Sequence, residues 1–355
     1  GMVMQLSRRA MLAGAASTLA TTAFANAPLT SLRPVARVEP QDAVAKLVKN
    51  AGLTGRIGVR VVDLASGEVL ESIDSSIAQP PASVTKAFTA LYALEALGAG
   101  HQFKTRIFAD GEIRNNILDG NLILAGGGDP ELVTDSLAAL AQSLKETGLT
   151  EVTGDFLVWD EALRNIDEID STQLDHFGYN PTVTGLNLNF NRVHFEWKRE
   201  EDDFVTALDA RSANYRPVVT TSRLAIVDRV DPVFTYRDLG DIDQWTVARG
   251  SLNDEGSRWL PVRHPALYAG EVFATFARSH GIVLKAPKET VKPPTGTPLA
   301  TFEGEPLTEV MRGMLRYSTN ITAEAAGLSA TNQRVGEKRG LRTSAIGMAR
   351  WMTER

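Results

Sequence analysis

Residues 80–100 read Pro-Pro-Ala-Ser-Val-Thr-Lys-Ala-Phe-Thr-Ala-Leu-Tyr-Ala-Leu-Glu-Ala-Leu-Gly-Ala-Gly. The two prolines interrupt any preceding element and the two glycines end the stretch, so a helix is expected from Ser83 to Leu97. Apolar residues recur within it at three- and four-residue spacing, which predicts one buried stripe along the helix. The predicted stripe consists of Val84, Phe88, Leu91 and Leu94.

Ser83 and Lys86 stand three residues apart at the start of this helix, so their side chains rise from one face. Lys86 can take the proton of Ser83 if burial and the positive end of the helix dipole keep its amine neutral part of the time. The N–H of Ser83 can form half of an oxyanion hole. The pair alone is a weak signal, because about one Ser-x-x-Lys arises by chance in a chain of this length and an N-cap serine beside a solvated lysine also explains it.

A second polar group, Ser318-Thr319-Asn320, lies in a break between two helical stretches, 307–315 and 321–328. A tight turn there points the Ser318 hydroxyl and the Asn320 amide the same way. A hydroxyl can relay a proton and an amide can fix a peptide carbonyl. A polar turn between helices is the alternative when this group is taken alone. Together, the two groups resemble the active site of penicillin-recognising serine acyl-transferases.

The composition is typical of a soluble chain long enough for two domains. The 355 residues are 43% hydrophobic and 23% charged, with a formal net charge of −6. An acidic molecule repels phosphate backbones, so a nucleic-acid partner is not expected. The absence of cysteine excludes disulfides and thiol nucleophiles from this sequence. The five histidines show no paired metal-ligand spacing, so no metal or other cofactor is expected.

Hydrophobic periodicity divides the rest of the chain into helical and strand-like stretches. A turn is expected at Asp110-Gly111. The predicted helices are 42–50, 134–147, 265–280 and 343–355, besides those already described. The predicted strands are 56–64, 68–73, 103–109, 121–125, 151–159 and 186–197.

The resemblance narrows to the D-alanyl-D-alanine carboxypeptidase and endopeptidase family of the penicillin-binding protein 4 type, the serine peptidases of the S13 kind. That family carries a long insertion after the Ser-x-x-Lys helix, and 235 positions separate Ser83 from Ser318 here. Further stretches similar to the family are Gly127-Gly128-Asp129-Pro130, Tyr179-Asn180 to Asn189, His264-Pro265-Ala266-Leu267-Tyr268 and Glu324. 

The resemblance implies an α/β fold: a transpeptidase or β-lactamase-like domain, made of an antiparallel sheet with helices, that carries a large strand-rich insertion. The domain is expected over residues 28–100 and 264–355, with the insertion at 101–263.

The resemblance also implies roles for individual residues. Ser83 is expected to attack the penultimate D-alanine of a peptidoglycan stem peptide, with Lys86 as general base, and β-lactam antibiotics are expected to acylate Ser83 as covalent inhibitors. Ser318 is expected to relay a proton and Asn320 to hold the substrate amide. Substrate-binding roles are implied for Asp160 and Tyr317. A solvated loop aspartate is the alternative for Asp160, and packing against the core is the alternative for Tyr317.

One family feature is missing from this sequence. The family completes its site with a Lys-Thr-Gly strand downstream of the Ser-x-Asn corner, and no such triplet follows Asn320. The similar stretch Lys292-Pro293-Pro294-Thr295-Gly296 precedes the corner, and its prolines disfavour a central strand. The chain is therefore expected to lack about the last hundred residues of its family. Two alternatives remain open, a non-catalytic peptidoglycan-binding protein and a serine β-lactamase.

The first residues predict export from the cytoplasm. Ser7-Arg8-Arg9 precedes a nearly uncharged run, Ala10 to Ala25, of 16 residues. The run is short for a membrane span and ends in Ala-Phe-Ala, which suits a signal peptidase. Residues 1–27 are therefore expected to be an export signal of the twin-arginine kind, cleaved after Ala25, with a periplasmic mature protein. An ordinary secretion signal or a membrane anchor is the alternative.

Overall fold

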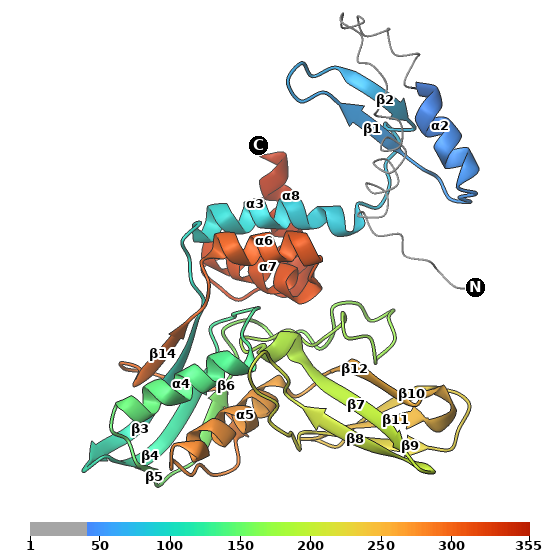
Figure 1. Cartoon of the computed structure of the whole chain (residues 1–355). Helices are drawn as coiled ribbons and strands as arrows, with labels where there is room; N and C mark the ends of the chain where they lie inside the picture. Colours follow the sequence, from blue (N-terminus) through green and yellow to red (C-terminus); the bar gives the residue numbers. More distant parts are fainter. Residues whose placement is uncertain (1–40) are drawn as a thin grey trace, which may run out of the picture. The chain divides into compact units, whose positions relative to one another are not determined.

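The computed structural model describes residues 41–355 (Figure 1). The chain divides into two compact units, residues 1–80 and 81–355. The export signal expected over residues 1–27, with its cleavage after Ala25, lies outside the described residues. In the part of the chain that the structure describes, no helix is both long and apolar enough to cross a membrane.

The described part of the first unit is one helix and one hairpin, as expected. Helix α2 spans Gln41–Asn50, and the antiparallel strands β1 and β2 span Val59–Val62 and Val69–Ile73. Asp63 fixes the turn between the strands, because its Oδ1 accepts hydrogen bonds from the backbone N–H groups of Ala65 and Ser66 at 2.9 and 2.8 Å.

In the second unit, the segments before residue 100 and after residue 306 form a helical layer (Figure 1). Helix α3 packs against α7, α6 and α8, although more than 200 residues separate it from them in the sequence. The core of the layer includes Tyr92, Ala93, Met311, Met314 and Trp351. The layer consists of the 3-10 turn η1 (Ala82–Val84), α3 (Thr85–Leu97), α6 (Leu307–Tyr317), α7 (Asn320–Val335) and α8 (Leu341–Thr353).

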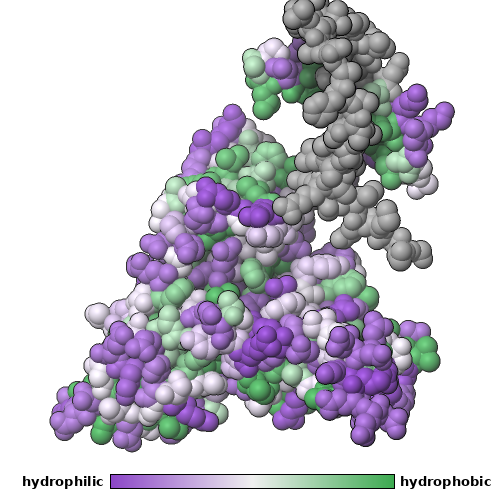
Figure 2. Space-filling model, viewed as in Figure 1, coloured by the Kyte–Doolittle hydropathy of each residue, from purple (hydrophilic) through white to green (hydrophobic). Residues whose placement is uncertain are grey.

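The predicted helix is present, but the apolar stripe expected to be its buried face is not buried. Val84, Phe88 and Leu91 are 63%, 39% and 58% exposed. Helix α3 instead packs through Ala90, Ala93 and their neighbours, since small side chains let another helix approach closely. Figure 2 shows hydrophobic residues among hydrophilic ones on the surface of this layer.

Residues 104–303 form the strand-rich region, which is built around a six-stranded sheet. Its longest pair, β3 and β4, is antiparallel, and β6 runs parallel to β4. Two helices, α4 (Thr134–Glu146) and α5 (Pro265–Ser279), cover one face of this sheet (Figure 1). The strands are β3 (Lys104–Arg114), β4 (Ile117–Ala125), β5 (Glu151–Val152), β6 (Phe156–Trp159), β13 (Lys288–Glu289) and β14 (Ala300–Glu303).

The prediction of a turn at Asp110-Gly111 is wrong. Strand β3 continues past it, and the hairpin turns at Asn115 and Asn116, whose φ angles of 52° and 64° suit a tight two-residue turn. Gly111 pairs with Gly120 on β4, and a Cβ on Gly111 would lie 2.2 Å from the Asp119 carbonyl oxygen. This glycine therefore permits a close approach of two strands.

Two three-stranded sheets complete the strand-rich region, with the orders β12-β7-β8 and β10-β11-β9. The strand expected from residue 186 begins only at Arg192, because residues 188–191 form the 3-10 turn η2 with left-handed φ angles. The strands are β7 (Arg192–Glu200), β8 (Asp203–Asp209), β9 (Ser222–Val227), β10 (Phe234–Asp238), β11 (Asp243–Ala248) and β12 (Glu255–Pro261), and η3 (Arg249–Ser251) precedes β12.

The domain boundary expected at residue 264 stays a prediction. Elements C-terminal to it still pack with the strand-rich region: α5 contacts α4 and β6, and β14 pairs with β3. The chain returns to the helical layer at Leu307, the first residue of α6.

Candidate active site

Ser83 and Lys86 meet at the N-terminal end of α3. Ser83 lies in the turn η1 and is exposed, whereas Lys86 lies in the first turn of α3 and is only 8% exposed. The Lys86 Nζ donates a hydrogen bond to the Ser83 Oγ at 3.1 Å. An exposed hydroxyl is therefore in contact with a buried amine, which is the arrangement that activates a serine nucleophile.

Asn320 contacts this pair from α7, the helix that packs against α3. It is the first residue of α7, and its Oδ1 accepts a hydrogen bond from the Lys86 Nζ at 2.8 Å. Its Nδ2 donates to the Tyr179 carbonyl oxygen at 3.1 Å, which fixes the orientation of the amide. One amine thus bridges α3 and α7, and the contact between these helices brings together residues 234 positions apart.

Burial and one carboxyl group determine the charge of this cluster. Burial lowers the pKa of Lys86, and the negative charge of Glu324 acts in the opposite direction. Burial raises the pKa of Glu324, which lies one helical turn after Asn320, and the positive charge of Lys86 opposes that shift. An amine with a lowered pKa is unprotonated in a larger fraction of molecules near neutral pH than an ordinary lysine is. It is therefore more often available to accept a proton.

Ser318 lies near this cluster in the sequence, but the described residues include no hydrogen-bond partner for its hydroxyl. It is the C-cap of α6 in a left-handed conformation, with φ 56° and ψ 46°, and it is exposed. The turn between α6 and α7 therefore presents this hydroxyl to solvent. The structure brings Asn320 into contact with Lys86 and leaves Ser318 on the rim.

The two expected substrate-binding residues differ in burial. Tyr317 is 72% exposed, with the Arg316 guanidinium over its ring at 5.3 Å, so the alternative of packing against the core is wrong. Asp160 follows β6 and is buried, so it is no solvated loop residue. Burial, with Glu289 as a smaller cause, raises the pKa of Asp160 to about 6. Neither residue contacts Ser83 or Lys86 directly by a hydrogen bond within residues 41–355.

Two members of the site had no role assigned from the sequence. Glu324 follows Asn320 by four residues, so the helical repeat alone places both on one face of α7. The carbonyl of Tyr179 orients the Asn320 amide, but a backbone oxygen leaves no signal in the sequence. The stretch Lys292 to Gly296 lies in the connection between β13 and β14, in the strand-rich region.

Comparisons with known proteins identify the family. Residues 41–343 match the model of the D-Ala-D-Ala carboxypeptidase 3 (S13) family. The chain is 27% identical over 332 residues to a D-alanyl-D-alanine carboxypeptidase of Actinomadura sp. (strain R39), covering 88% of this chain and 59% of the relative. It is 24% identical over 315 residues to D-alanyl-D-alanine carboxypeptidase DacB of Haemophilus influenzae, covering 83% of this chain and 62% of the relative. The chain thus spans about three fifths of the length of these relatives.

Solved structures agree at the level of the fold. Penicillin binding protein 4 of Haemophilus influenzae matches with a TM-score of 0.66 and 21% identity, over 84% of this chain and 67% of that one. A second structure of the same protein, in complex with a β-lactam, matches with a TM-score of 0.66 and 19% identity over 88% of this chain and 69% of that one. The fold expected from the sequence, an α/β fold of the transpeptidase-like kind, is confirmed, and its sheets contain parallel as well as antiparallel pairs. The chain belongs to the D-Ala-D-Ala carboxypeptidase 3 (S13) family.

Proposed function

We propose that this chain is a serine D-Ala-D-Ala carboxypeptidase or endopeptidase that cleaves peptidoglycan stem peptides through an acyl-enzyme on Ser83. The observation that carries the proposal is the position of the Lys86 Nζ, buried and hydrogen-bonded both to the Ser83 Oγ at 3.1 Å and to the Asn320 Oδ1 at 2.8 Å. All three residues lie within the stretch that matches the family.

Acylation begins when neutral Lys86 takes the proton of the Ser83 hydroxyl. The Ser83 Oγ then bonds to the carbonyl carbon of the penultimate D-alanine, and the oxygen of the resulting intermediate accepts from backbone N–H groups at the helix start. When the C–N bond breaks, the proton that Lys86 took from Ser83 passes through the exposed Ser318 hydroxyl to the leaving amine, which leaves Lys86 neutral again. The terminal D-alanine, or the cross-linked stem in the endopeptidase reaction, leaves as a neutral amine.

Deacylation uses the same groups in reverse. Water gives a proton to the basic site at Lys86 and attacks the ester carbon, and the Ser83 oxygen regains its proton as the ester bond breaks. Asn320 holds the substrate amide through its side chain while its bond to Tyr179 keeps it oriented. The lowered pKa of Lys86 supports both proton transfers.

Asp160 and Tyr317 complete the proposal on the substrate side. With a pKa of about 6, Asp160 is mostly ionised at pH 7 and can attract the ammonium group of a stem diamino acid. The exposed ring of Tyr317 offers a surface for the stem beside Ser318. The protein acts in the periplasm, where its substrate is, and β-lactams acylate Ser83 because their strained amide resembles the D-Ala-D-Ala bond.

The test is release of D-alanine from a stem pentapeptide. We expect the chain to release it and Ser83→Ala to lose about 10⁴-fold or more of the rate, as removal of a nucleophile does in serine peptidases. Ser66→Ala, which changes an exposed serine in the β1–β2 turn, serves as the matched control and keeps the full rate. The Haemophilus influenzae relative provides the positive control. D-alanine release by Ser83→Ala at the unmutated rate, or none from the chain under conditions where the relative is active, would contradict the proposal.

A further inference from the structure

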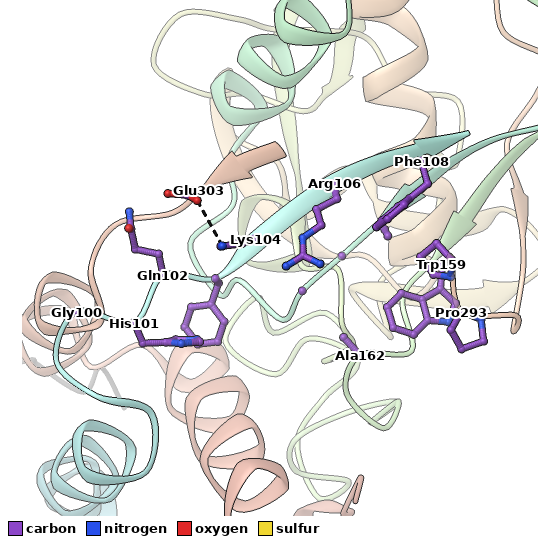
Figure 3. A pocket seen from close by; sticks show the side chains of 15 residues that line it. Gly100, His101, Gln102, Lys104, Arg106, Phe108, Trp159, Ala162, Pro293 and Glu303 are labelled. Atoms are coloured by element: carbon purple, nitrogen blue, oxygen red, sulfur yellow. Dashed lines mark ion pairs between the residues drawn. The ribbon is translucent and has the colours of Figure 1, made fainter. Parts of the chain in front are cut away.

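A cleft of about 670 Å³ lies on the strand-rich region, on the face of the six-stranded sheet that α4 and α5 leave uncovered (Figure 3). Its walls come from the segment after α3, the strands β3, β4, β6 and β14, and the β13–β14 connection. Its volume is in the range of small-molecule sites in proteins. The lining includes Arg106, Phe108, Trp159, Pro293 and Glu303.

The register of the sheet explains why this face is hollow. Arg106 on β3 pairs with Ala125 on β4, and Ala125 pairs with Trp159 on β6. Adjacent strands lie about 4.8 Å apart, so the small Ala125 leaves a gap of roughly two strand spacings between a guanidinium and an indole. Phe108, two residues along β3, belongs to the small apolar cluster under the cleft.

The charges in the cleft favour an anionic group. Lys104 is paired with Glu303 at the rim, at 3.5 Å. Arg106 points into the cleft in Figure 3, and no carboxylate within residues 41–355 forms an ion pair with it. A half-buried guanidinium without a partner presents a fork of donors that matches a carboxylate. The indole nitrogen of Trp159 is buried, so the ring offers its apolar surface to the cleft beside Pro293.

We propose that this cleft binds a carboxylate-bearing amino-sugar saccharide, the glycan part of the peptidoglycan to which the stem peptide is attached. The apolar face of a pyranose ring stacks on Trp159 and the proline wall, and its carboxylate pairs with Arg106. The carboxylate has two chemical sources, the lactyl group of the sugar when it is free and the acidic residue of the stem when it is not. This inference rests on the proposed function.

The cleft and Ser83 lie at opposite ends of α3, too far apart for one stem to join them. The cleft begins at Gly100, just after the C-terminal end of α3, whereas Ser83 lies at the N-terminal end of that helix. Thirteen helical residues span about 20 Å. An extended stem of five residues spans roughly 17 Å. A saccharide in the cleft is therefore a sugar of the glycan strand other than the one that carries the cleaved stem.

Three ligands separate the contributions of the ring and of the carboxylate. The first is the disaccharide of N-acetylglucosamine and N-acetylmuramic acid with a free lactyl carboxylate. The second is the same disaccharide amide-linked through that group to alanyl-glutamate, and the third is diacetylchitobiose, which has no carboxylate. Binding is measured by calorimetry on the Ser83→Ala chain, so that no turnover occurs. We expect the first, the second or both to bind at least about tenfold more tightly than diacetylchitobiose.

Arg106→Gln removes the charge and keeps a polar side chain of similar length. It should weaken binding of the acidic saccharides at least about tenfold and leave diacetylchitobiose unchanged. Arg223→Gln, which changes an exposed arginine on β9, is the matched control and should change none of the three. Equal binding of all three ligands, absence of binding, or an unchanged affinity in Arg106→Gln would overturn the inference.

The result is separable from that of the proposed function. Arg106 is not part of the Ser83 site, so Arg106→Gln in the chain with Ser83 intact should be acylated by benzylpenicillin at the unmutated rate. Saccharide binding without acylation would contradict the catalytic proposal alone, and acylation without saccharide binding would contradict the cleft alone.

Discussion

The second unit contains two polar clusters, and they are built differently. The charged cluster consists of Ser83, Lys86, Asn320 and Glu324 in the helical layer. The neutral cluster consists of Thr134, Thr184, Asn187, Asn189 and Tyr268 in the strand-rich region. The charged cluster contains an exposed hydroxyl, an amine and a carboxyl group, whereas all side chains of the neutral cluster are buried and uncharged.

The neutral cluster fixes the shape of a loop. Asn189 has a left-handed φ of 51°, and its side chain accepts from the Thr134 N–H and donates to the Thr134 hydroxyl and the Tyr268 hydroxyl. Asn187 similarly exchanges bonds with the backbone of Thr184. With its donors and acceptors used within the protein, such a cluster has nothing left to offer a substrate. The comparison indicates that a charged cluster at the surface, whose hydrogen-bonding groups are not all used within the protein, has a catalytic role. A neutral cluster whose donors and acceptors are all used has a structural role.

Lys86→Arg tests the charged half of the comparison and has the largest expected effect. A guanidinium stays protonated and cannot act as base, so acylation by benzylpenicillin should slow by about 10²- to 10⁴-fold. The rate is followed by intact mass, and thermal unfolding verifies that the variant is folded. Lys285→Arg, at an exposed position, is the control. A rate within tenfold of the unmutated chain would remove Lys86 from the role of base.

Asn189→Ala tests the neutral half. It leaves the Thr134 N–H and its neighbours unpaired in the interior, which should lower the free energy of unfolding by about 2–4 kcal/mol. Urea titration measures this change. The folded fraction should still be acylated at the normal rate, and Asn214→Ala, at an exposed asparagine that donates to Asp135, should be nearly neutral. An Asn189→Ala variant that is stable but inactive would contradict the structural role of the neutral cluster.

Asp129→Asn tests whether a shifted pKa by itself identifies a catalytic residue. Burial raises the pKa of Asp129 from 3.8 to about 6. Because the pKa of Asp129 is higher in the folded state, its carboxyl group contributes to the free energy of unfolding below about pH 4. That contribution is lost as the pH rises through about 6. At pH 8 the variant should be more stable by up to about 3 kcal/mol, while at pH 4 the difference should fall below about 1 kcal/mol.

The Asp129→Asn side chain keeps the Oδ1 that accepts from the Glu131 N–H at 2.9 Å, so the turn remains bonded. The measurement is urea unfolding at both pH values, with acylation followed in parallel. We expect no change in the acylation rate, since Asp129 has no contact with the charged cluster. Loss of acylation in Asp129→Asn would show that a raised pKa marks chemistry even outside that cluster.

Glu324→Gln has the smallest predicted effect and tests the electrostatic coupling between Glu324 and Lys86. The negative charge of Glu324 raises the pKa of Lys86 against the larger lowering by burial. The acylation rate should rise with pH as Lys86 loses its proton, with a midpoint below 10.5 in the unmutated chain. Removing the charge of Glu324 should move that midpoint to still lower pH. A pH profile that does not move, or moves upward, would exclude electrostatic coupling between the two residues.

Much of this arrangement follows from the sequence, and the exceptions have physical causes. Helices α4 and α5 match their predicted stretches because each has a clear apolar face and an end signal. The buried face of α3 is predicted wrongly from the sequence. Both the stripe that begins at Val84 and the small residues around Ala90 recur at helical spacing. Spacing alone does not tell which of the two faces its neighbour packs against.

The candidate site was predictable in part for a similar reason. The contact of Ser83 with Lys86 is local and follows from helix geometry. The contact of Lys86 with Asn320 spans 234 positions and was expected only through the resemblance to a family. The burial of Asp160 depends on how the loop after β6 packs, which neither periodicity nor the motif encodes.

Whether Ser83 is the nucleophile is tested most directly by intact mass after incubation with benzylpenicillin, followed by peptide mapping of any adduct. We expect one drug molecule per chain, attached at Ser83, and none on Ser83→Ala. An adduct at another residue, or equal labelling of the Ser83→Ala chain, would contradict the claim that Ser83 is the nucleophile prepared by Lys86.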